Sequence, residues 1–394
     1  MDILVSGASI AGPAVAYWLA RAGHRVEVVE RTDGLRTAGH NVDVRGPGRE
    51  VLRHMGIEDA VRAETTGEAG LRFVDGRRVL AEFPASQDDR SGATAEVEIL
   101  RGRLARLIVD AGRPDVNYLF GDQIAELDPD DDGVTVRLAG GSTRRVDVVI
   151  IAEGARSRTR DRHFDGVTLR ELGLYTAFGT IPRDRSDNDW WNWYNAVGGR
   201  SISVRPDNLG TTRVALSYLS GPSGVQDLPP AEQRAALSDV YAGAGWQSDR
   251  IRTALATSDE LYVDYLTQVR APEWTAGPVV LLGDSAWCAT PLSGIGTTLA
   301  LTGAYVLAGE LCTAPWLPDA LANYERRMRP LVDTAQKLPP GTPKLAHPRS
   351  RAGVAALRTA LRLAGSRPAR ALAGRFASPT AASTELPFYP ALHA

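Results

Sequence analysis

Three small residues near the start of the chain have the types and spacing needed to hold a dinucleotide. In the stretch "LVSGASIAGPAVAYWLARAGHRVEVVERT", Gly7, Ser9 and Gly12 stand between an apolar run and an amphipathic run. Gly7 permits a tight turn, a small residue at 9 lets a pyrophosphate approach the backbone, and Gly12 lets helix and strand pack closely. The N–H groups of the helix N-terminus then face the phosphates. Glu30 follows Gly12 by 18 residues, where a carboxylate accepts hydrogen bonds from ribose hydroxyls. A glycine turn without a ligand is the alternative, but strand, helix and acid together favour dinucleotide binding.

A second stretch with similar chemistry lies late in the chain, "PVVLLGDSAWCATPLSGIGTTLALTGAYVLAGEL". A strand ends at Gly283 and Asp284, and a helix follows Gly294 and Gly296. Asp284 could accept a hydrogen bond from the ribityl chain of a flavin. The amides at 294–298 would lie beside the flavin C2 carbonyl and stabilise negative charge on the reduced ring. An ordinary strand–loop–helix would explain this stretch alone. Two nucleotide-type motifs suited to one ligand predict FAD, bound without a covalent link because we find no His or Cys attachment motif.

The elements that must position these motifs alternate between two kinds. Apolar runs at both ends of the chain indicate buried parallel strands with helices between them, and the middle of the chain has the alternating pattern of antiparallel strands. The expected parallel strands and helices are 2–7, 13–23, 25–30, 147–151, 278–286 and 295–311, and the antiparallel strands lie within 174–220. A helix is also expected within 96–112 and another near 352–364.

The fold class predicted from this order is α/β: a Rossmann-like FAD domain, an inserted antiparallel-sheet substrate domain (an α+β insert) and a C-terminal helical region. A chain that returns to its first domain this late is not a single-sheet Rossmann protein. The expected FAD-binding domain is discontinuous, 1–75, 97–173 and 270–335; the substrate domain is 76–96 and 174–269; and the helical tail is 336–394.

Composition excludes several classes of function. The chain has 394 residues, a net charge of −2 and two cysteines, Cys288 and Cys312, without metal-ligand spacing. We therefore expect no metal site, no disulfide framework, no nucleic-acid partner and no membrane partner. With no room for a signal peptide before the first strand, we expect a cytoplasmic protein, either a monomer or a homodimer.

The chain resembles the class A flavoprotein monooxygenases, which have the p-hydroxybenzoate hydroxylase-like fold. Within that family it is similar to the tetracycline-inactivating type and to actinobacterial tailoring oxygenases. The resemblance covers roughly residues 1 to 335. It rests on "GASIAG" with Glu30, on "DVVIIAEGARSRTR" (147–160) and on "GDSAWCATPLSGIG" (283–296). Together these motifs are specific, although none is so alone.

The resemblance also implies site residues and a reaction. Arg45 stands where the loop of that family meets the flavin, Arg101 matches a helix arginine that contacts FAD, and Asp284 matches the flavin-contacting aspartate. The full set of expected cofactor-binding residues is Gly7, Ser9, Ile10, Ala11, Gly12, Glu30, Arg31, Arg45, Arg101, Gly283, Asp284, Pro291, Gly294, Ile295, Gly296 and Thr297. NAD(P)H would reduce the flavin, O2 would add at C4a, and the hydroperoxide would hydroxylate an aromatic or enolic small molecule.

Two positions depart from the family pattern. Glu153 replaces the usual aspartate before Gly154, in a motif tied to FAD and to pyridine-nucleotide use. Trp287 replaces a histidine that is frequent after the Gly-Asp motif, so any polar role of that histidine is lost. The flavin does the chemistry, so no catalytic side chain is assigned. The six scattered histidines, His40 and His347 among them, are expected at the surface.

The substrate is expected on one face of the antiparallel sheet. Because alternate residues of a strand share a face, we group Trp191 and Trp193 with an apolar face that packs on helices. The opposite, mixed face would orient the polar groups of an aromatic substrate. The expected substrate residues are Asn192, Tyr194, Ser203 and Arg213 on that face, with Phe178, Pro291 and Leu292 as weaker candidates. Arg213 would favour an anionic or phenolate substrate. A solvated face with Arg213 in a surface ion pair is the alternative.

Three other functions compete with this interpretation. "WNWYN" (191–195) partly matches the Trp-x-Trp motif of flavin-dependent halogenases, but the following Ile-Pro is missing and the first lysine is Lys337. A non-oxygenating flavin oxidoreductase acting by hydride transfer stays open, and O2 use that depends on substrate would separate the two. A non-catalytic FAD-binding protein is disfavoured by the intact set of Gly7, Glu30 and Asp284.

Overall fold

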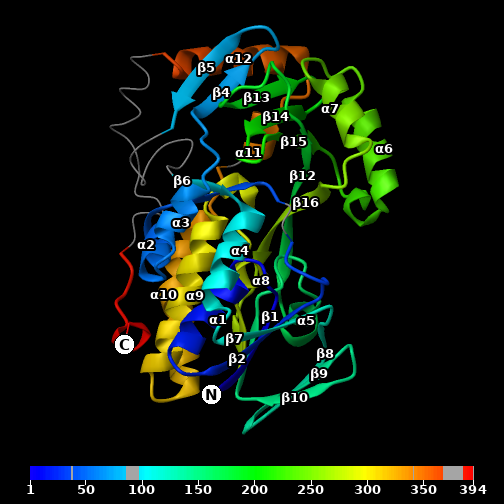
Figure 1. Cartoon of the computed structure of the whole chain (residues 1–394). Coiled ribbons are helices and arrows are strands. Elements are labelled where there is room, and N and C mark those ends of the chain that lie inside the picture. Colours follow the sequence, from blue (N-terminus) through cyan, green and yellow to red (C-terminus); the bar gives the residue numbers. More distant parts are fainter. Residues whose placement is uncertain (37–38, 86–96, 340, 367–384, 394) are drawn as a thin grey trace.

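The structure is a computed structural model, and it describes residues 1–36, 39–85, 97–339, 341–366 and 385–393. The chain forms two parts that lie one above the other in Figure 1. Both termini belong to the lower part. The described helices include none that is long and apolar enough to cross a membrane.

The lower part is built on a mainly parallel sheet with β1 at its centre. β1 (Asp2–Ser6) pairs in parallel with β2 (Arg25–Glu30) on one side and with β11 (Val148–Ile151) on the other. The sheet order is β17 (Thr275–Ala276), β18 (Val279–Leu281), β11, β1, β2 and β7 (Val116–Phe120), with only β17 antiparallel. Residues from both ends of the chain therefore complete one sheet, which confirms the α/β expectation.

Helices pack beside this sheet because each presents an apolar surface to it or to a neighbouring helix. α1 (Ala11–Arg21) lies next to α4 (Arg101–Gly112) and α9 (Gly296–Thr313). α9 is apolar on nearly all sides, and it is enclosed by α1, α2 (Gly46–His54) and α10 (Leu317–Ala335) (Figure 1). This packing places the start of α9 against α2, where a Cβ at Gly48 would lie 3.0 Å from the Thr298 Cα.

Smaller elements complete the lower part. They are β3 (Asn41–Val44), α3 (Glu58–Ala63), β6 (Val97–Leu100), β8 (Ile124–Asp130), β9 (Gly133–Leu138), β10 (Thr143–Val146), α5 (Arg158–His163), α8 (Asp284–Trp287) and the 3-10 turn Pro291–Ser293. β3 pairs with β6, and β8 to β10 form a separate antiparallel sheet.

The upper part is a seven-stranded sheet. Its order is β16 (Leu261–Arg270), β12 (Thr168–Pro182), β15 (Thr211–Leu219), β14 (Arg200–Pro206), β13 (Trp191–Ala196), β4 (Gly70–Val74) and β5 (Val79–Pro84). Neighbours are antiparallel except β13 and β4. The structure thus places β4 in this sheet, whereas a boundary at residue 75 assigns it to the FAD-binding part.

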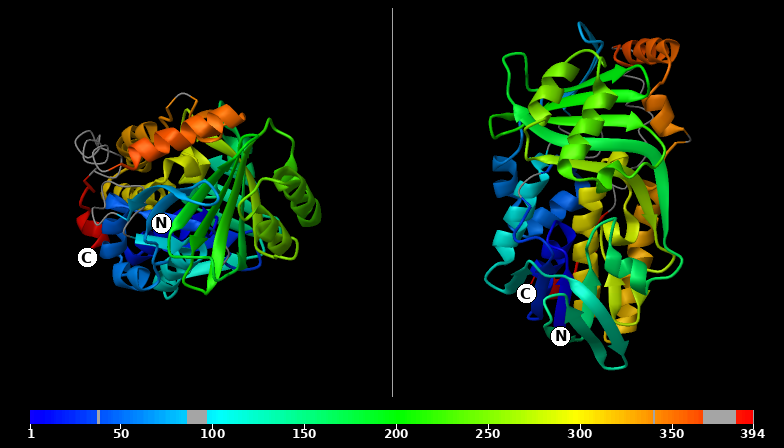
Figure 2. Two further views of the ribbon diagram at one scale, coloured as in Figure 1. Left: turned by 90° about the horizontal axis from the view of Figure 1, so that it is seen from above. Right: turned by 90° about the vertical axis from the view of Figure 1, so that its right-hand side faces the viewer.

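One face of the upper sheet is covered by helices. α6 (Pro230–Tyr241) and α7 (Ser248–Leu255) supply Leu237, Tyr241 and Ile251 to a second hydrophobic core. The short 3-10 turn Val225–Asp227 precedes α6. Figure 2 shows these two helices on the outer side of the sheet, so the other face is directed toward the rest of the molecule.

The C-terminal region contacts both parts. α11 (Thr342–Ala346) and α12 (Arg351–Ala364) lie against the upper sheet, and the Asn195 side-chain amide donates to the Ala346 carbonyl at 2.7 Å. The last described turn, Pro390–Leu392, packs on α9 of the lower part. The expected helix near 352–364 is confirmed as α12, and residues 367–384 of the expected tail lie outside the described residues.

Candidate active site

The glycine-rich turn has the close backbone approach that the sequence predicted. Gly7 has φ +109°, and a Cβ there would lie 2.4 Å from the Ala152 carbonyl oxygen. A Cβ at Gly12 would lie only 1.9 Å from the Gly7 oxygen. Both positions therefore require glycine, and the turn brings the first residues of α1 to the carboxyl end of β1. α1 begins after Ile10 without an acidic residue in its first turn, so its N-terminus is suited to an anion.

Glu30 ends β2 and is fixed beside this turn. Its carboxylate accepts from the Ala8 amide at 2.9 Å and from the Thr32 amide at 3.0 Å. The Thr32 hydroxyl also donates to it at 2.9 Å. These bonds orient the carboxylate and leave further acceptor lone pairs, which is what recognition of two ribose hydroxyls requires.

Arg101 connects the turn to the motif from the other end of the chain. Its guanidinium donates to the Ser9 hydroxyl at 2.8 Å. Its positive charge also acts on Asp284, where it opposes the effect of burial; burial raises the pKa of Asp284. Asp284 is nevertheless exposed to solvent. Residues 9, 101 and 284 were all expected at the cofactor, and the structure brings them together.

The loop before α9 has the strained backbone common at binding sites. Thr290 has φ +78° and ψ 148°, a region that residues with a Cβ rarely adopt. Gly294 has φ +64°, and a Cβ at Gly296, the first residue of α9, would meet no protein atom within 4 Å. The Arg45 amide donates to the Thr298 hydroxyl at 3.0 Å, so the Arg45 loop and the start of α9 lie side by side as expected.

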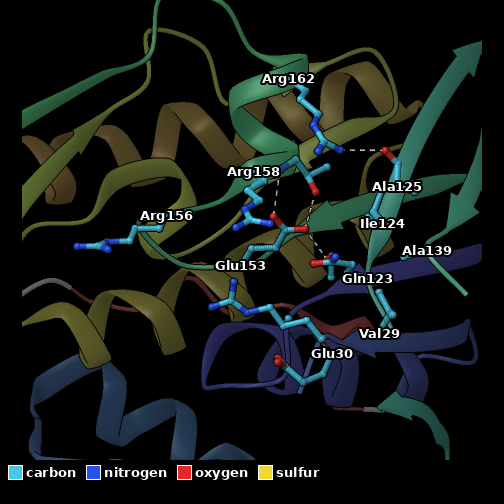
Figure 3. A pocket seen from close by; sticks show the side chains of 14 residues that line it. Val29, Glu30, Gln123, Ile124, Ala125, Ala139, Glu153, Arg156, Arg158 and Arg162 are labelled. Carbon is cyan, nitrogen blue, oxygen red and sulfur yellow. Dashed lines mark hydrogen bonds between the residues drawn. The ribbon is translucent and has the colours of Figure 1, made fainter. Parts of the chain in front are cut away.

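A cavity of about 240 Å³ opens where the adenosine half of a dinucleotide is expected. It is lined by the predicted Gly7, Glu30 and Arg31, and also by residues that sequence reasoning missed: Gln123, Ile124, Ala125, Ala139, Arg158 and Arg162. Figure 3 shows Glu30 and Val29 on one side and Glu153 with Arg158 on the other. Several of the missed residues follow β7, the parallel neighbour of β2, so knowledge of the strand order would have found them.

The two departures from the family pattern have clear structural roles. Glu153 accepts from the Ser6, Ser157 and Thr159 hydroxyls at 2.6 to 2.7 Å, so its carboxylate joins β1 to the start of α5. Trp287 is 1% exposed and packs against Trp274 with ring centroids 4.5 Å apart. Trp287 therefore fills the core where the family often has a histidine.

These observations fit bound FAD. The glycine-rich turn leaves no space for a Cβ at Gly7 or at Gly12. At the start of α9, by contrast, the space beside Gly296 is open. The carboxylates of Glu30 and Asp284 stand at the two ends of the site, with Arg101 between them. Within the described residues, no group of three or more His, Cys, Asp or Glu side chains is placed to hold a metal ion.

The predicted face of β13 is wrong. Ala196 pairs with Arg200, so the hairpin loop 197–199 has three residues and residues of equal parity share a face. Asn192 pairs with Val204 and Tyr194 with Ile202, which places both on the face covered by α6 and α7. The Tyr194 hydroxyl donates to the Ala244 carbonyl at 3.1 Å, and the Asn192 amide donates to Asn188 at 3.0 Å.

Trp191 and Trp193 instead lie on the opposite face, which His347 partly covers beside Ser201 and Trp193. Trp193 pairs with Ser203, and Ser203 pairs with Ala215, which is opposite Phe178. Ser203 and Phe178, two of the expected substrate residues, therefore share the face of Trp193, and their role stays a prediction. The prediction assumed that the two tryptophans lie on the same face as the apolar residues of β14 and β15. The register of the strands places them on the other face.

Arg213 lies on the same face as Ser203, but other side chains occupy its guanidinium. It donates to Asp207 at 2.9 Å and to Glu260 at 2.8 Å, and it also contacts Thr180. The side chain is only 8% exposed. The alternative interpretation expected Arg213 to form an ion pair at the surface. The structure shows the ion pairs, but they are buried.

His40 and Tyr262 are two functional candidates that the sequence did not reveal. The His40 ring stacks on Phe178 with centroids 4.3 Å apart. Burial lowers the pKa of His40 to about 3, aided by the charges of Arg101 and Arg205, so its imidazole is neutral. Tyr262, opposite Phe178 in the sheet register, is 48% exposed and also lies near Arg101. The expectation that the histidines are surface residues is wrong for His347, which is 1% exposed and contacts Ser201, whereas His40 is partly exposed.

Comparison with known proteins agrees with this geometry. Residues 1–336 match the FAD binding domain family FAD_binding_3. The flavin-dependent monooxygenase eupH of a Phoma species is 37% identical, over 91% of this chain and 90% of that protein. The crystal structure of the tetracycline destructase Tet(51) superimposes with a TM-score of 0.81 at 30% identity, covering 98% of this chain and 99% of that one. Klebsiella pneumoniae HpxO, complexed with FAD and uric acid, shares the fold with a TM-score of 0.75 at 22% identity, covering 96% of this chain and 97% of that one.

A parallel-sheet nucleotide cradle joined to an antiparallel sheet defines a flavoprotein of the hydroxylase fold. The chain belongs to the FAD-binding-domain family of flavin-dependent monooxygenases. It is therefore an enzyme that binds FAD and acts on a small molecule.

Proposed function

We propose that this enzyme hydroxylates a planar aromatic or enolic small molecule, with NAD(P)H as the electron donor and O2 as the oxygen source. The observation that carries the proposal is the position of Arg101. This arginine bonds the glycine-rich turn through Ser9, and its charge also reaches His40 and Tyr262 at the aromatic face of the upper sheet. The cofactor cradle and a face suited to flat rings thus border the same region.

The residues of the chain have distinct tasks in this proposal. The cradle from Gly7 to Gly12 and Glu30 would hold the pyrophosphate and ribose, and Asp284 with Arg101 would hold the central part of the cofactor. When bound, FAD supplies the redox and oxygen-transfer chemistry. The positive N-terminal end of α9 would stabilise negative charge on a reduced cofactor held against it. Phe178 and Trp193 would orient the substrate ring and exclude water.

The substrate belongs to natural-product tailoring or antibiotic modification in this proposal. Support comes from a neighbour of 30% identity that is named a tetracycline destructase, which makes tetracycline the first compound to assay. We also propose that the chain is divided into an FAD-binding domain, a substrate domain and a helical tail. The first boundary, expected at residue 75, is placed before β4 in this proposal.

The test is oxidation of NADH and NADPH by the FAD-loaded enzyme, with tetracycline and a panel of phenols and enols. We expect one compound to accelerate oxidation and to gain one oxygen atom, which mass spectrometry after reaction under 18O2 would detect. Substrate-dependent oxidation without incorporation of label would favour the hydride-transfer alternative. A purified protein that retains no flavin would contradict both.

A further inference from the structure

Three buried charged side chains meet where the lower part joins the upper sheet. Glu68 precedes β4, Glu98 belongs to β6, and Arg205 belongs to β14. The Arg205 guanidinium donates from Nε to Glu68 at 2.8 Å, and its Nη2 lies 2.7 Å from Glu98. The two glutamate side chains are 2% and 4% exposed. We call these three residues the Arg205 cluster.

The hydrogen bonds and ion pairs of the Arg205 cluster leave one carboxyl oxygen without a donor. Glu98 Oε1 accepts from the Thr66 hydroxyl at 3.0 Å and from the Asn41 amide. Glu68 Oε1 is buried and has no hydrogen-bond donor among the described residues, whereas Glu98 Oε2 is ion-paired with Arg205 Nη2. Glu98 also lies within hydrogen-bonding reach of Glu68. Two ionised carboxylates with one guanidinium would leave a net charge of −1 in a buried site, which is strongly unfavourable. One proton between the two carboxyl groups would give Glu68 Oε1 a partner and make the cluster neutral.

Arg205 also faces the region where the substrate is expected. It shares the sheet face of Trp193 with Ser203, and its guanidinium stacks over Trp191 at 4.1 Å from the ring centroid. The side chain is 15% exposed, and its charge reaches His40, which stacks on Phe178. Glu68 and Glu98 therefore bind one edge of the Arg205 guanidinium, which lies beside the aromatic residues of this sheet face.

We propose that Glu68 and Glu98 share a single proton, and that this proton lets Arg205 select a substrate bound as an anion, such as a phenolate or an enolate. With the proton, the cluster is neutral and the arginine attracts an anionic oxygen. Without it, the cluster carries −1 and repels the same oxygen. This inference rests on the proposed function, because it assumes that an aromatic or enolic substrate lies on this face.

The groups around the Arg205 cluster set the pH at which the proton is lost. Burial raises the pKa of Glu68 to about 9; the charge of Arg205 opposes this rise, and Glu98 adds to it. Asp43 on β3 is the other carboxylate that acts on Arg205, and His40 between β3 and the sheet is neutral. Affinity for an anion should therefore fall as the pH rises through about 9.

The experiment measures binding of 4-nitrophenolate to the FAD-loaded enzyme by difference absorbance, at pH values where this phenol is fully ionised. For wild type we expect Kd to rise about 5- to 10-fold between pH 8 and pH 10, because about nine-tenths of the cluster is protonated at pH 8 and about one-tenth at pH 10 when the pKa is about 9. In Glu68→Gln the amide cannot ionise, so Kd should not change over that range. Glu64→Gln, which removes a carboxylate ion-paired with Arg103 outside the Arg205 cluster, should keep the wild-type pH dependence.

A second measurement keeps the inference falsifiable if Glu68→Gln does not fold. Infrared difference spectra of the wild-type holoenzyme should show a protonated carboxyl group at pH 7 that is lost by pH 10. Absence of that band, absence of bound 4-nitrophenolate at pH 8, or an unchanged pH dependence in Glu68→Gln would each overturn the inference. Failure of the proposed function would give a different result: the infrared band would be present, but no compound would accelerate NAD(P)H oxidation.

Discussion

Replacing Gly296 by valine should separate cofactor binding from folding. Gly296 is the first residue of α9, and a Cβ there would meet no protein atom within 4 Å. Valine also has a higher helix propensity than glycine, so the free energy of unfolding of the apoprotein should be unchanged or higher by up to about 0.5 kcal/mol. With FAD bound, the added methyl groups would enter space that we assign to the flavin. Overpacking of that kind costs about 1–3 kcal/mol, which corresponds to FAD affinity about 5- to 150-fold weaker.

The assay for Gly296→Val combines calorimetry of the apoprotein with titration of FAD by flavin fluorescence. Gly12→Ala is the matched control, because its Cβ would lie 1.9 Å from the Gly7 oxygen. That clash forces α1 away from β1, so Gly12→Ala should lower both apoprotein stability and FAD affinity. Wild-type FAD affinity and turnover in Gly296→Val would show that Gly296 only begins a helix and that the flavin lies elsewhere.

Three further changes test other parts of the structure. Glu30→Ala leaves the Ala8 and Thr32 amides without their acceptor and removes the proposed ribose acceptor, so FAD should bind about 10- to 100-fold more weakly; full flavin retention would disprove that role. Thr290→Gly relieves a φ of +78° and should raise the free energy of unfolding by about 1 kcal/mol in urea titration, a gain that an unstrained residue would not give. Burial raises the pKa of Glu68 to about 9, so the folded protein binds that proton more tightly than the unfolded chain does. Stability should therefore fall as pH rises from about 5 to about 9. Urea titrations across this range should show a smaller fall in Glu68→Gln, and equal slopes would refute the assignment.

The cofactor half of the site could be predicted because its geometry is local. Gly7, Gly12 and Glu30 lie within one strand–helix–strand unit, and the turn that links them leaves no space for a side chain. The second motif, from Asp284 to Gly296, is also one strand–loop–helix unit. In both cases the residue types fix the backbone directly, so the sequence contains the information.

The substrate half depends on distant contacts that no short pattern encodes. Whether Trp193 or Tyr194 faces the cofactor depends on the three-residue loop 197–199, because one residue more or fewer would exchange the faces. His40 is brought to Phe178 by the segment that leads into β3, and a contact between residues so far apart in the chain leaves no local signature. The Arg205 cluster likewise unites residues from three separate segments.

The order of strands in the lower sheet has a consequence for synthesis of the protein. β1 and β11 are complete early, but β18 pairs with β11 only after residue 281 has been made. Until then the growing chain carries an unpaired edge on β11, and α9 is missing from its place beside α1. The strands β12 to β16 are contiguous in the chain and can pair before that point. Such late long-range pairing is slow and exposes the edge to other chains. Because Asp284 and the start of α9 belong to the proposed cofactor site, FAD should bind only after this segment has been made, and aggregation during expression should depend on how quickly it arrives.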